Sequence, residues 1–313
     1  MALSDLPAMV YHPCYSDLAL PDRHRYPIEK YRYLHQQLLQ LGVSATHFIQ
    51  PTAIMPDELA LVHCPAYIQS LSDGSIDSKA MRRIGFPWSA QLYQRSLYSV
   101  GGTVLTAQLA LQHGIALHLS GGYHHAFYAE GSGFCLFNDL VVAAKTLLAQ
   151  GVDKILLLDL DVHQGDGSAL LVADEPRIIS CSLHCEKNFP YRKQVSDWDI
   201  GFAKGCSDAE YLQAVRQSLS SLVQWHQPDL VLYDAGVDIH RDDELGLLNI
   251  STTALYQRDL MVLQYCTTRN IPVAAVIGGG YQRNIAALVK LHLQLFKAAF
   301  TLCDSDFAGK IET

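Results

Sequence analysis

Residues 154–163 read KILLLDLDVH, an aliphatic run that turns polar at Asp159. A near-continuous aliphatic run of this length predicts a strand buried on both faces, as in a parallel sheet covered by helices. Because alternate residues of a strand share a face, we expect Asp159, Asp161 and His163 to point the same way. Buried carboxylates need partners, so this pattern predicts a divalent metal ion with nitrogen and oxygen ligands. The alternative is a strand end whose acids reach solvent.

Four more aliphatic runs predict strands of the same kind, at 115–119, 177–183, 230–233 and 272–277. Amphipathic stretches long enough for crossover helices flank them, at 89–112, 138–150, 208–226, 253–269 and 284–302. This alternation predicts an open three-layer α/β fold with a parallel sheet. No repeat or linker interrupts the chain, and we expect a single domain over residues 1–313.

The composition narrows the class of protein further. The 313 residues carry 23 Lys+Arg and 31 Asp+Glu, a net charge of −8, which argues against a nucleic-acid binder. We find no apolar run of about 18 residues and no basic segment before an apolar N-terminal stretch, so we expect neither a membrane span nor a signal peptide. The eight cysteines form no CxxC pair, which favours reduced, mostly buried thiols in a cytoplasmic protein.

Polar clusters follow the predicted strands, and ligands bind at the carboxyl ends of strands in open α/β sheets. These clusters read SGGYHH at 120–125, DAGVD at 234–238 and GGGY at 278–281. Asp238 could join Asp161 and His163 as a third ligand, leaving a position open for water and a substrate carbonyl. Its alternative is a helix N-cap, and Asp242, Asp243 and Glu244 are expected to be solvated loop charges.

Three further features could carry chemistry. The His124-His125 pair could hold two basic nitrogens toward a bound water, with Asp159 and Asp166 available to orient the rings. Tyr281 could donate to a developing oxyanion. Phe134 and Phe189 could wall an apolar channel. Taken singly, these residues are equally well explained as surface histidines, a packing tyrosine and core phenylalanines.

Four segments together resemble the zinc-dependent histone deacetylase family. They are SGGYHHAFYAEGSGFCLFND at 120–139, DLDVHQGDG at 159–167, YDAGVDIHRDDELG at 233–246 and GGGYQ at 278–282. Asp238-Ile239, Leu245-Gly246 and Tyr281-Gln282 look most like the class IV branch, and residues 22–31 are similar to bacterial class IV members. Asp166 departs from relatives that have Asn there, and Ile277 from those with a fourth glycine.

The resemblance implies the arginase–deacetylase fold, with a parallel sheet of about eight strands. It implies a zinc site at Asp161, His163 and Asp238. The implied catalytic residues are His124 backed by Asp159, His125 backed by Asp166, and Tyr281. The implied acyl-lysine channel is formed by Gly133, Phe134 and Phe189. A structural potassium ion, held partly by main-chain carbonyls, would lie at Asp159, Asp161, His163, Ser182 and Leu183.

The activity implied is removal of an acetyl or longer acyl group from a lysine side chain, or from a related amine, by metal-activated water. A binuclear manganese ureohydrolase of the same fold is an alternative, although no acid stands two residues beyond His163. An acetylpolyamine amidohydrolase and a non-catalytic acyl-binding protein are others. The net charge would attract basic peptides or polyamines. The loop at 72–91, with Arg82, Arg83, Phe86 and Trp88, is expected to rim the entrance. Acyl length and oligomeric state stay open.

Overall fold

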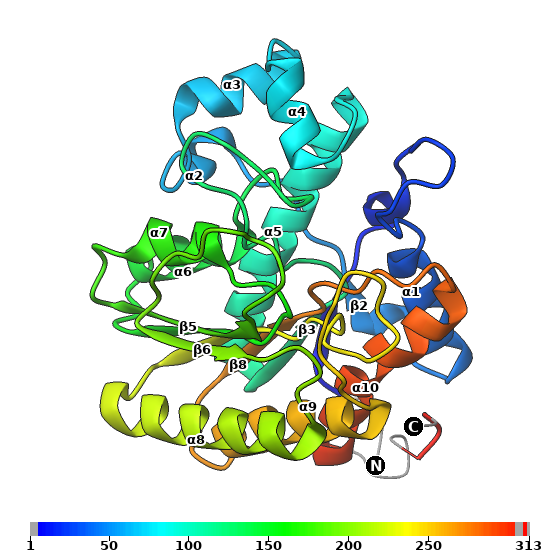
Figure 1. Cartoon of the computed structure of the whole chain (residues 1–313), viewed down its shortest axis with the longest axis vertical. Helices are drawn as coiled ribbons and strands as arrows, with labels where there is room; N and C mark the ends of the chain where they lie inside the picture. The colour runs from blue at the N-terminus through cyan, green and yellow to red at the C-terminus, as the bar shows by residue number, and fades with distance from the viewer. Residues whose placement is uncertain (1–5, 304–308, 312–313) are drawn as a thin grey trace.

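The computed structural model describes residues 6–303 and 309–311, and its centre is one eight-stranded parallel sheet (Figure 1). The strand order is β2-β1-β3-β8-β7-β4-β5-β6. The strands are β1 (Ala8–Val10), β2 (Phe48–Ile49), β3 (Ile115–His118), β4 (Ile155–Asp159), β5 (Ile178–Cys185), β6 (Trp198–Phe202), β7 (Leu230–Asp234) and β8 (Val273–Val276). All neighbouring strands pair in parallel, and the three-layer fold predicted from the sequence is confirmed.

The five predicted strands correspond to β3, β4, β5, β7 and β8, and every residue of β4 is buried, as its aliphatic run requires. Asp159 is the last residue of β4, so Asp161 and His163 lie in the loop beyond it rather than on the strand. The expectation that all three side chains share one strand face is therefore wrong. Asp159 turns to a different partner from the other two, as described below.

The five predicted helices are also present, within two residues of their expected ends. They are α5 (Ala90–His113), α6 (Asp139–Ala149), α8 (Asp208–His226), α9 (Thr252–Thr267) and α10 (Ile285–Cys303). Side chains of Ser89, Asn138, Ser207 and Ser251 cap the first four by accepting a backbone N–H three residues on. The shorter helices are α1 (Lys30–Gln40), α2 (Pro56–Leu59), α3 (Pro65–Asp73), α4 (Ser78–Ile84) and α7 (Asp166–Val172). Two 3-10 turns, η2 (Pro13–Ser16) and η3 (Ala45–His47), complete the set.

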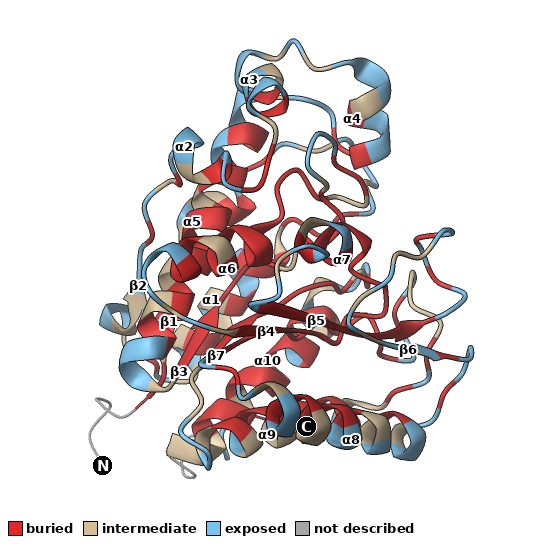
Figure 2. Cartoon of the chain, turned by 90° about the vertical axis from the view of Figure 1, so that its left-hand side faces the viewer, coloured by how far each residue is buried: buried red, intermediate tan, exposed pale blue. Residues whose placement is uncertain are grey.

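Helices cover both faces of the sheet (Figure 2). Helices α5, α6 and α7 lie on one face, and α8, α9 and α10 lie on the other. Helices α2, α3 and α4 project beyond the first layer, at the top of Figure 1. The carboxyl ends of the central strands β7, β4 and β5 open toward the loops that follow them, where the sequence places its polar clusters.

Helix α10 is long and apolar enough, by length and composition alone, to cross a membrane, which was not expected from the sequence. In the structure 61% of its apolar window is buried. It packs against α9 and α1 as part of the second helical layer, and core helices of soluble folds share this composition. Five of the eight cysteines are buried, which agrees with the prediction of mostly buried thiols, while a cytoplasmic location stays a prediction.

Candidate active site

Asp161, His163 and Asp238 bring three potential metal ligands to one buried point. Asp161 and His163 follow β4, and Asp238 follows β7, the neighbour of β4 in the sheet. His163 Nδ1 lies 3.0 Å from Asp161 Oδ1 and 3.1 Å from Asp238 Oδ2. Ligands at about 2.0–2.1 Å from a tetrahedral zinc ion would lie roughly 3.3 Å apart. The donor set of two carboxylates and one imidazole therefore fits a zinc-sized ion.

Backbone contacts hold the two carboxylates in place. Asp161 Oδ2 accepts the N–H of Gly279 at 3.0 Å, and Asp238 Oδ1 accepts the N–H of Val162 at 2.9 Å. A Cβ atom on Gly279 would lie 2.2 Å from Asp238 Oδ2 and 2.3 Å from Asp161 Oδ2. Only glycine can stand there, which gives one glycine of the GGGY motif a steric reason.

Two buried acids so close together require a counter-charge. Burial, followed by the neighbouring Asp161 carboxylate, raises the pKa of Asp238 above its usual range. Lys30 of α1 is buried beside these acids and donates from Nζ to the Gly278 carbonyl at 2.8 Å. Burial lowers the pKa of this lysine to about 8. A divalent cation on the three ligands would offset the charge that the protein alone leaves poorly compensated.

His124 and His125 lie next to this cluster, and each imidazole has an acidic partner. His124 Nδ1 is 2.7 Å from Asp159 Oδ2, and His125 Nδ1 is 2.6 Å from Asp166 Oδ1. Their Nε2 atoms are 3.1 Å apart, and His124 Nε2 lies 3.9 Å from Asp161 Oδ1. The Nε2 atoms, which do not bond these aspartates, therefore lie on the side of the three potential ligands.

The surroundings of the two imidazoles shift their pKa values in opposite directions. Burial alone would disfavour a charge on His124, but the Asp159 carboxylate outweighs it and raises the pKa of His124 well above its usual value. Burial and the adjacent His124 charge lower the pKa of His125 to about 4, despite its bond to Asp166. At neutral pH His125 is thus the unprotonated member of the pair, and such a separation marks divided acid and base roles.

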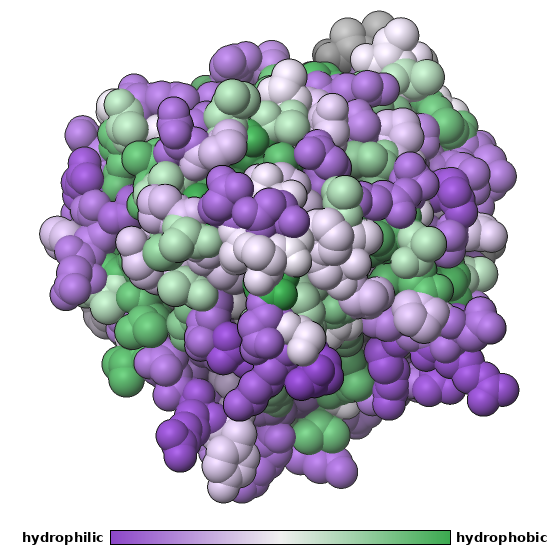
Figure 3. All heavy atoms as spheres, turned by 90° about the horizontal axis from the view of Figure 1, so that it is seen from above, coloured by the Kyte–Doolittle hydropathy of each residue, from purple (hydrophilic) through white to green (hydrophobic). Residues whose placement is uncertain are grey.

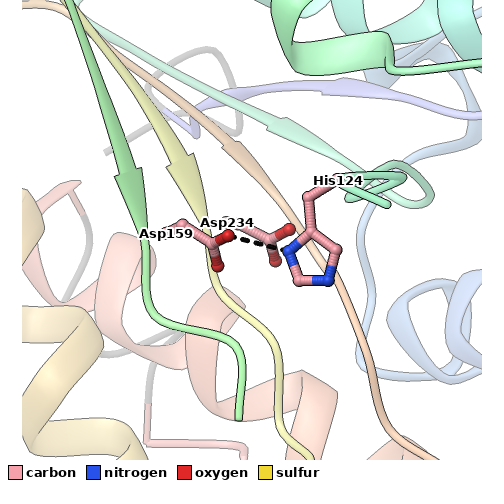
Figure 4. A group of neighbouring side chains, drawn as sticks. All are labelled: His124, Asp159 and Asp234. Atoms are coloured by element: carbon pink, nitrogen blue, oxygen red, sulfur yellow. Dashed lines mark hydrogen bonds and ion pairs between the residues drawn. The ribbon is translucent and has the colours of Figure 1, made fainter. Parts of the chain in front are cut away.

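Asp234 is a buried acid that the sequence does not single out. It ends β7 directly opposite Asp159 on β4, and both carboxylates lie on the same side of His124 (Figure 4). Its Oδ2 atom has no hydrogen-bond partner within the described part of the chain, and burial raises the pKa of this carboxyl well above the usual value. His124, Asp159 and Asp234 form a second cluster of potential metal ligands, in which His124 and Asp159 already share a 2.7 Å bond. The only sequence signal for Asp234 is its place at a strand end.

The expected channel residues lie around the same point. The Phe189 ring stands edge-on to His125 with 4.8 Å between centroids, and the Tyr281 ring lies 6.1 Å from His163. The Phe134 ring is 5.8 Å from that of Tyr281. A Cβ atom on Gly133 would lie 2.6 Å from the His125 ring, so a larger residue would displace the imidazole. The structure thus brings both aromatics and Gly133 to the approach to the histidine pair.

Asp243 does not lie at the surface as the sequence predicts. It is buried, and its carboxylate accepts the N–H groups of Tyr281 at 2.7 Å, Leu245 at 2.8 Å and Gly246 at 3.0 Å. The expectation of a solvated loop charge is wrong for this residue, because the loop folds inward onto the backbone of Tyr281. Asp242 does face solvent, with 73% of its side chain exposed.

Residues 72–91, which include α4, contact Phe134 of the proposed channel. Phe86 is buried, and its ring lies 5.5 Å from both His24 and Phe134. The Trp88 indole donates to the Leu71 carbonyl at 2.8 Å, which fixes the loop to α3. Arg83 reaches across to the Gly131 carbonyl at 3.2 Å. These contacts place the loop behind Phe134.

Comparison with known proteins identifies the family. A family model described as histone deacetylase domain matches residues 24–296. An uncharacterized protein of a Picosynechococcus species is 49% identical over 298 residues, covering 93% of this chain and 97% of that protein. Histone deacetylase 2 of Arabidopsis thaliana is 30% identical over 77% of this chain and 65% of its own length. Acetoin utilization protein AcuC of Bacillus subtilis is 29% identical over 87% of this chain and 76% of its own length. The chain belongs to the histone deacetylase family.

Solved structures share the fold. A crystal structure of a histone deacetylase homologue complexed with SAHA superimposes with a TM-score of 0.82 at 23% identity, covering 97% of this chain and 84% of that one. A homologue from Aquifex aeolicus gives a TM-score of 0.81 at 22% identity, covering 94% and 84%. These matches establish the arginase–deacetylase fold, and the family places the chain among deacetylase-type hydrolases with a catalytic metal.

Proposed function

We propose that the protein is a zinc-dependent deacylase of the class IV type, which hydrolyses the amide of an acylated lysine or a related amine. One observation carries the proposal: two histidines, each bonded to its own aspartate, adjoin the buried Asp161, His163 and Asp238 donor set. This combination supplies a general base beside a metal-bound water, which amide hydrolysis requires.

Zinc bound at these three ligands would act as a Lewis acid and lower the pKa of its water toward about 7. His125 Nε2 would accept a proton from the attacking water, because Nδ1 is bonded to Asp166 and the ring is neutral at neutral pH. The same nitrogen later delivers the proton to the leaving amine. His124, charged and fixed by Asp159, stabilises the developing negative charge electrostatically.

Tyr281 is the oxyanion donor in this proposal. Burial raises the pKa of its hydroxyl well above the usual value, so the group keeps the proton it donates. Its ring lies beside His163, and its backbone is fixed by Asp243. One donor of this kind contributes about 2.7–4 kcal/mol to transition-state stabilisation.

We also propose a structural potassium ion at Asp159, Asp161, His163, Ser182 and Leu183. Asp159 and Ser182 are register partners on β4 and β5, so their main-chain groups lie side by side at the ends of these strands. Carbonyl, carboxylate and hydroxyl oxygens are suitable ligands for such a hard cation.

An acyl-length series on one lysine peptide tests the proposed activity. Acetyl, octanoyl and myristoyl peptides would be assayed beside an acetylated polyamine, with and without a chelator. We expect hydrolysis that the chelator abolishes and zinc restores. Absence of turnover on every acyl substrate with zinc bound would refute the deacylase proposal. Chelator-resistant turnover would refute its metal dependence.

A further inference from the structure

Charged side chains at the channel mouth differ in balance from the chain as a whole. The net charge of the protein is −8. Around the mouth, however, three arginines contact only two glutamates. Arg25 and Arg283 both bond Glu244, at 3.2 and 3.0 Å, and Arg83 bonds Glu130 at 2.8 Å. Within these three ion pairs, arginines outnumber glutamates by three to two.

Contacts place these arginines beside the channel. Arg25 stands between His24 and Tyr26, whose rings lie 6.0 and 5.3 Å from that of Phe134. Arg83 donates to the carbonyl of Gly131, two residues before Gly133. Arg25 thus adjoins residues that contact Phe134, and Arg83 contacts the segment that leads to Gly133.

Arg283 is likewise close to a residue of the proposed site. Arg283 comes two residues after Tyr281, and its backbone N–H donates to Glu244 at 3.2 Å. The backbone and the guanidinium of Arg283 therefore both bond Glu244, two residues along the chain from Tyr281.

Arg25 and Arg283 have unused donor capacity. Both bond the same oxygen of Glu244, although a guanidinium has five N–H donors. Their side chains are 44% and 68% exposed. The pair could therefore receive a second carboxylate, for which planar bidentate binding by arginine is well suited.

Two carboxylates near the proposed channel are already engaged, because Glu244 and Glu130 bond arginines. Asp242 is an exposed carboxylate that could receive an ammonium group, so a polyamine is the competing substrate in the test below. The face of the molecule seen from above mixes hydrophilic and apolar residues (Figure 3).

We infer that Arg25 and Arg283 form a carboxylate-binding subsite, and that the preferred substrate is a peptide with an acidic residue next to its acyl-lysine. This inference rests on the proposed deacylase function and names the substrate class of that site. It reverses the expectation from net charge, because local charges at short range outweigh distant ones screened beyond about 10 Å at ordinary salt.

Matched peptides test the inference. Three peptides would share one acyl-lysine and differ only in its neighbour, which is Glu, Gln or Lys, and an acetylated polyamine would be assayed beside them. At low ionic strength we expect kcat/KM for the Glu peptide to exceed that for the Lys peptide by about three- to tenfold, with the difference shrinking in salt.

Variants test whether Arg25 and Arg283 cause the preference for the Glu peptide. Arg25→Gln and Arg283→Gln should each bring the Glu-to-Lys ratio of kcat/KM toward one. Arg177→Gln is the control, because Arg177 is 52% exposed and bonds Glu175 ahead of β5, at the opposite end of the strands. Equal kcat/KM values, a preference for the Lys peptide or polyamine, or a ratio unaffected by Arg25→Gln and Arg283→Gln would overturn the inference.

Binding provides a readout that needs no turnover. Fluorescence anisotropy of labelled Glu and Lys peptides on the zinc-free protein should show the same preference, lost in Arg25→Gln and Arg283→Gln. If no acyl peptide is hydrolysed but this preference persists, the deacylase proposal fails and the carboxylate subsite stands. If peptides are hydrolysed without preference, the subsite fails alone.

Discussion

The carboxylate of Asp243 accepts the backbone N–H of Tyr281 at 2.7 Å, which ties the loop carrying the tyrosine to the loop that follows Asp238. The other two hydrogen bonds of Asp243, from Leu245 and Gly246, fold its own loop around the same carboxylate. Lys30 holds the preceding glycines from the opposite side through the Gly278 carbonyl. The position of the proposed oxyanion donor is therefore set by residues from α1 and from the loop after β7.

Asp243→Asn should lower kcat more than it raises KM. The amide keeps one oxygen acceptor but loses the charge, and a hydrogen bond to a charged group contributes about 1.5–3 kcal/mol, or roughly ten- to a hundredfold. Steady-state kinetics on one acyl peptide measure this effect. Asp242→Asn is the matched control, since that side chain is exposed, and it should behave as wild type. Equal kcat in the two variants would contradict a positioning role.

Tyr281→Phe should reduce kcat by about a hundred- to a thousandfold, because one oxyanion donor is lost. Zinc content and thermal stability should stay unchanged, since the hydroxyl is no ligand in the proposed site. Metal analysis and kcat on the same preparation check both statements. Tyr191→Phe, which alters a hydroxyl on a 98% exposed side chain, serves as the control. Near-wild-type turnover by Tyr281→Phe would remove the tyrosine from the mechanism.

The parts of the fold that the sequence predicts are those with strong local patterns. Strand β4 is a continuous aliphatic run, and a fully buried strand requires one. Strands β1 and β2 have three and two residues, which is too short for any periodicity to be visible. Strand β6 lies at the edge of the sheet and alternates between half-buried and exposed positions before Phe202, so its pattern resembles a loop.

The site residues also fall into those that a local motif predicts and those that depend on distant contacts. Strand-end motifs indicate which side chains gather, because neighbouring parallel strands bring their carboxyl ends together. Asp243 could not be recognised as buried, since Asp242-Asp243-Glu244 reads as a charged loop and the decisive contact is 38 residues away at Tyr281. Asp234 is hidden for a similar reason: its burial between the two glycine loops depends on Gly122 and Gly278, far along the chain.

His63 should make stability depend on pH. Its ring is buried, its Nε2 accepts the N–H of Asn138 at 2.9 Å, and its Nδ1 lies 2.8 Å from the Phe127 carbonyl. Because Nε2 accepts, the ring is neutral in the folded state, and burial lowers its pKa from 6.5 to about 4. The unfolded chain therefore binds more protons between these values, and stability falls as pH drops through that window, by up to about 3 kcal/mol.

Denaturant titrations at about pH 7 and about pH 5 measure this loss of unfolding free energy. His63→Gln should lower stability at neutral pH but flatten its dependence on pH, because the glutamine does not titrate. His113→Gln alters an exposed histidine and should leave the slope as in the wild type. An unchanged slope in His63→Gln would assign the pH dependence to other groups.

Removal of zinc should destabilise the protein more at high pH than at low pH. Burial and the Asp161 carboxylate raise the pKa of Asp238, so the metal-free folded state binds more protons than the unfolded chain. Its stability therefore falls as pH rises above the usual carboxyl range. Zinc binds the deprotonated ligands and replaces the missing charge.

We expect about one zinc per chain and a larger zinc-induced rise in Tm at about pH 8 than at about pH 6. Asp238→Asn should abolish most of the rise, whereas Asp242→Asn should retain it. Two metal ions per chain, or a rise in Tm independent of pH, would argue against the site formed by Asp161, His163 and Asp238.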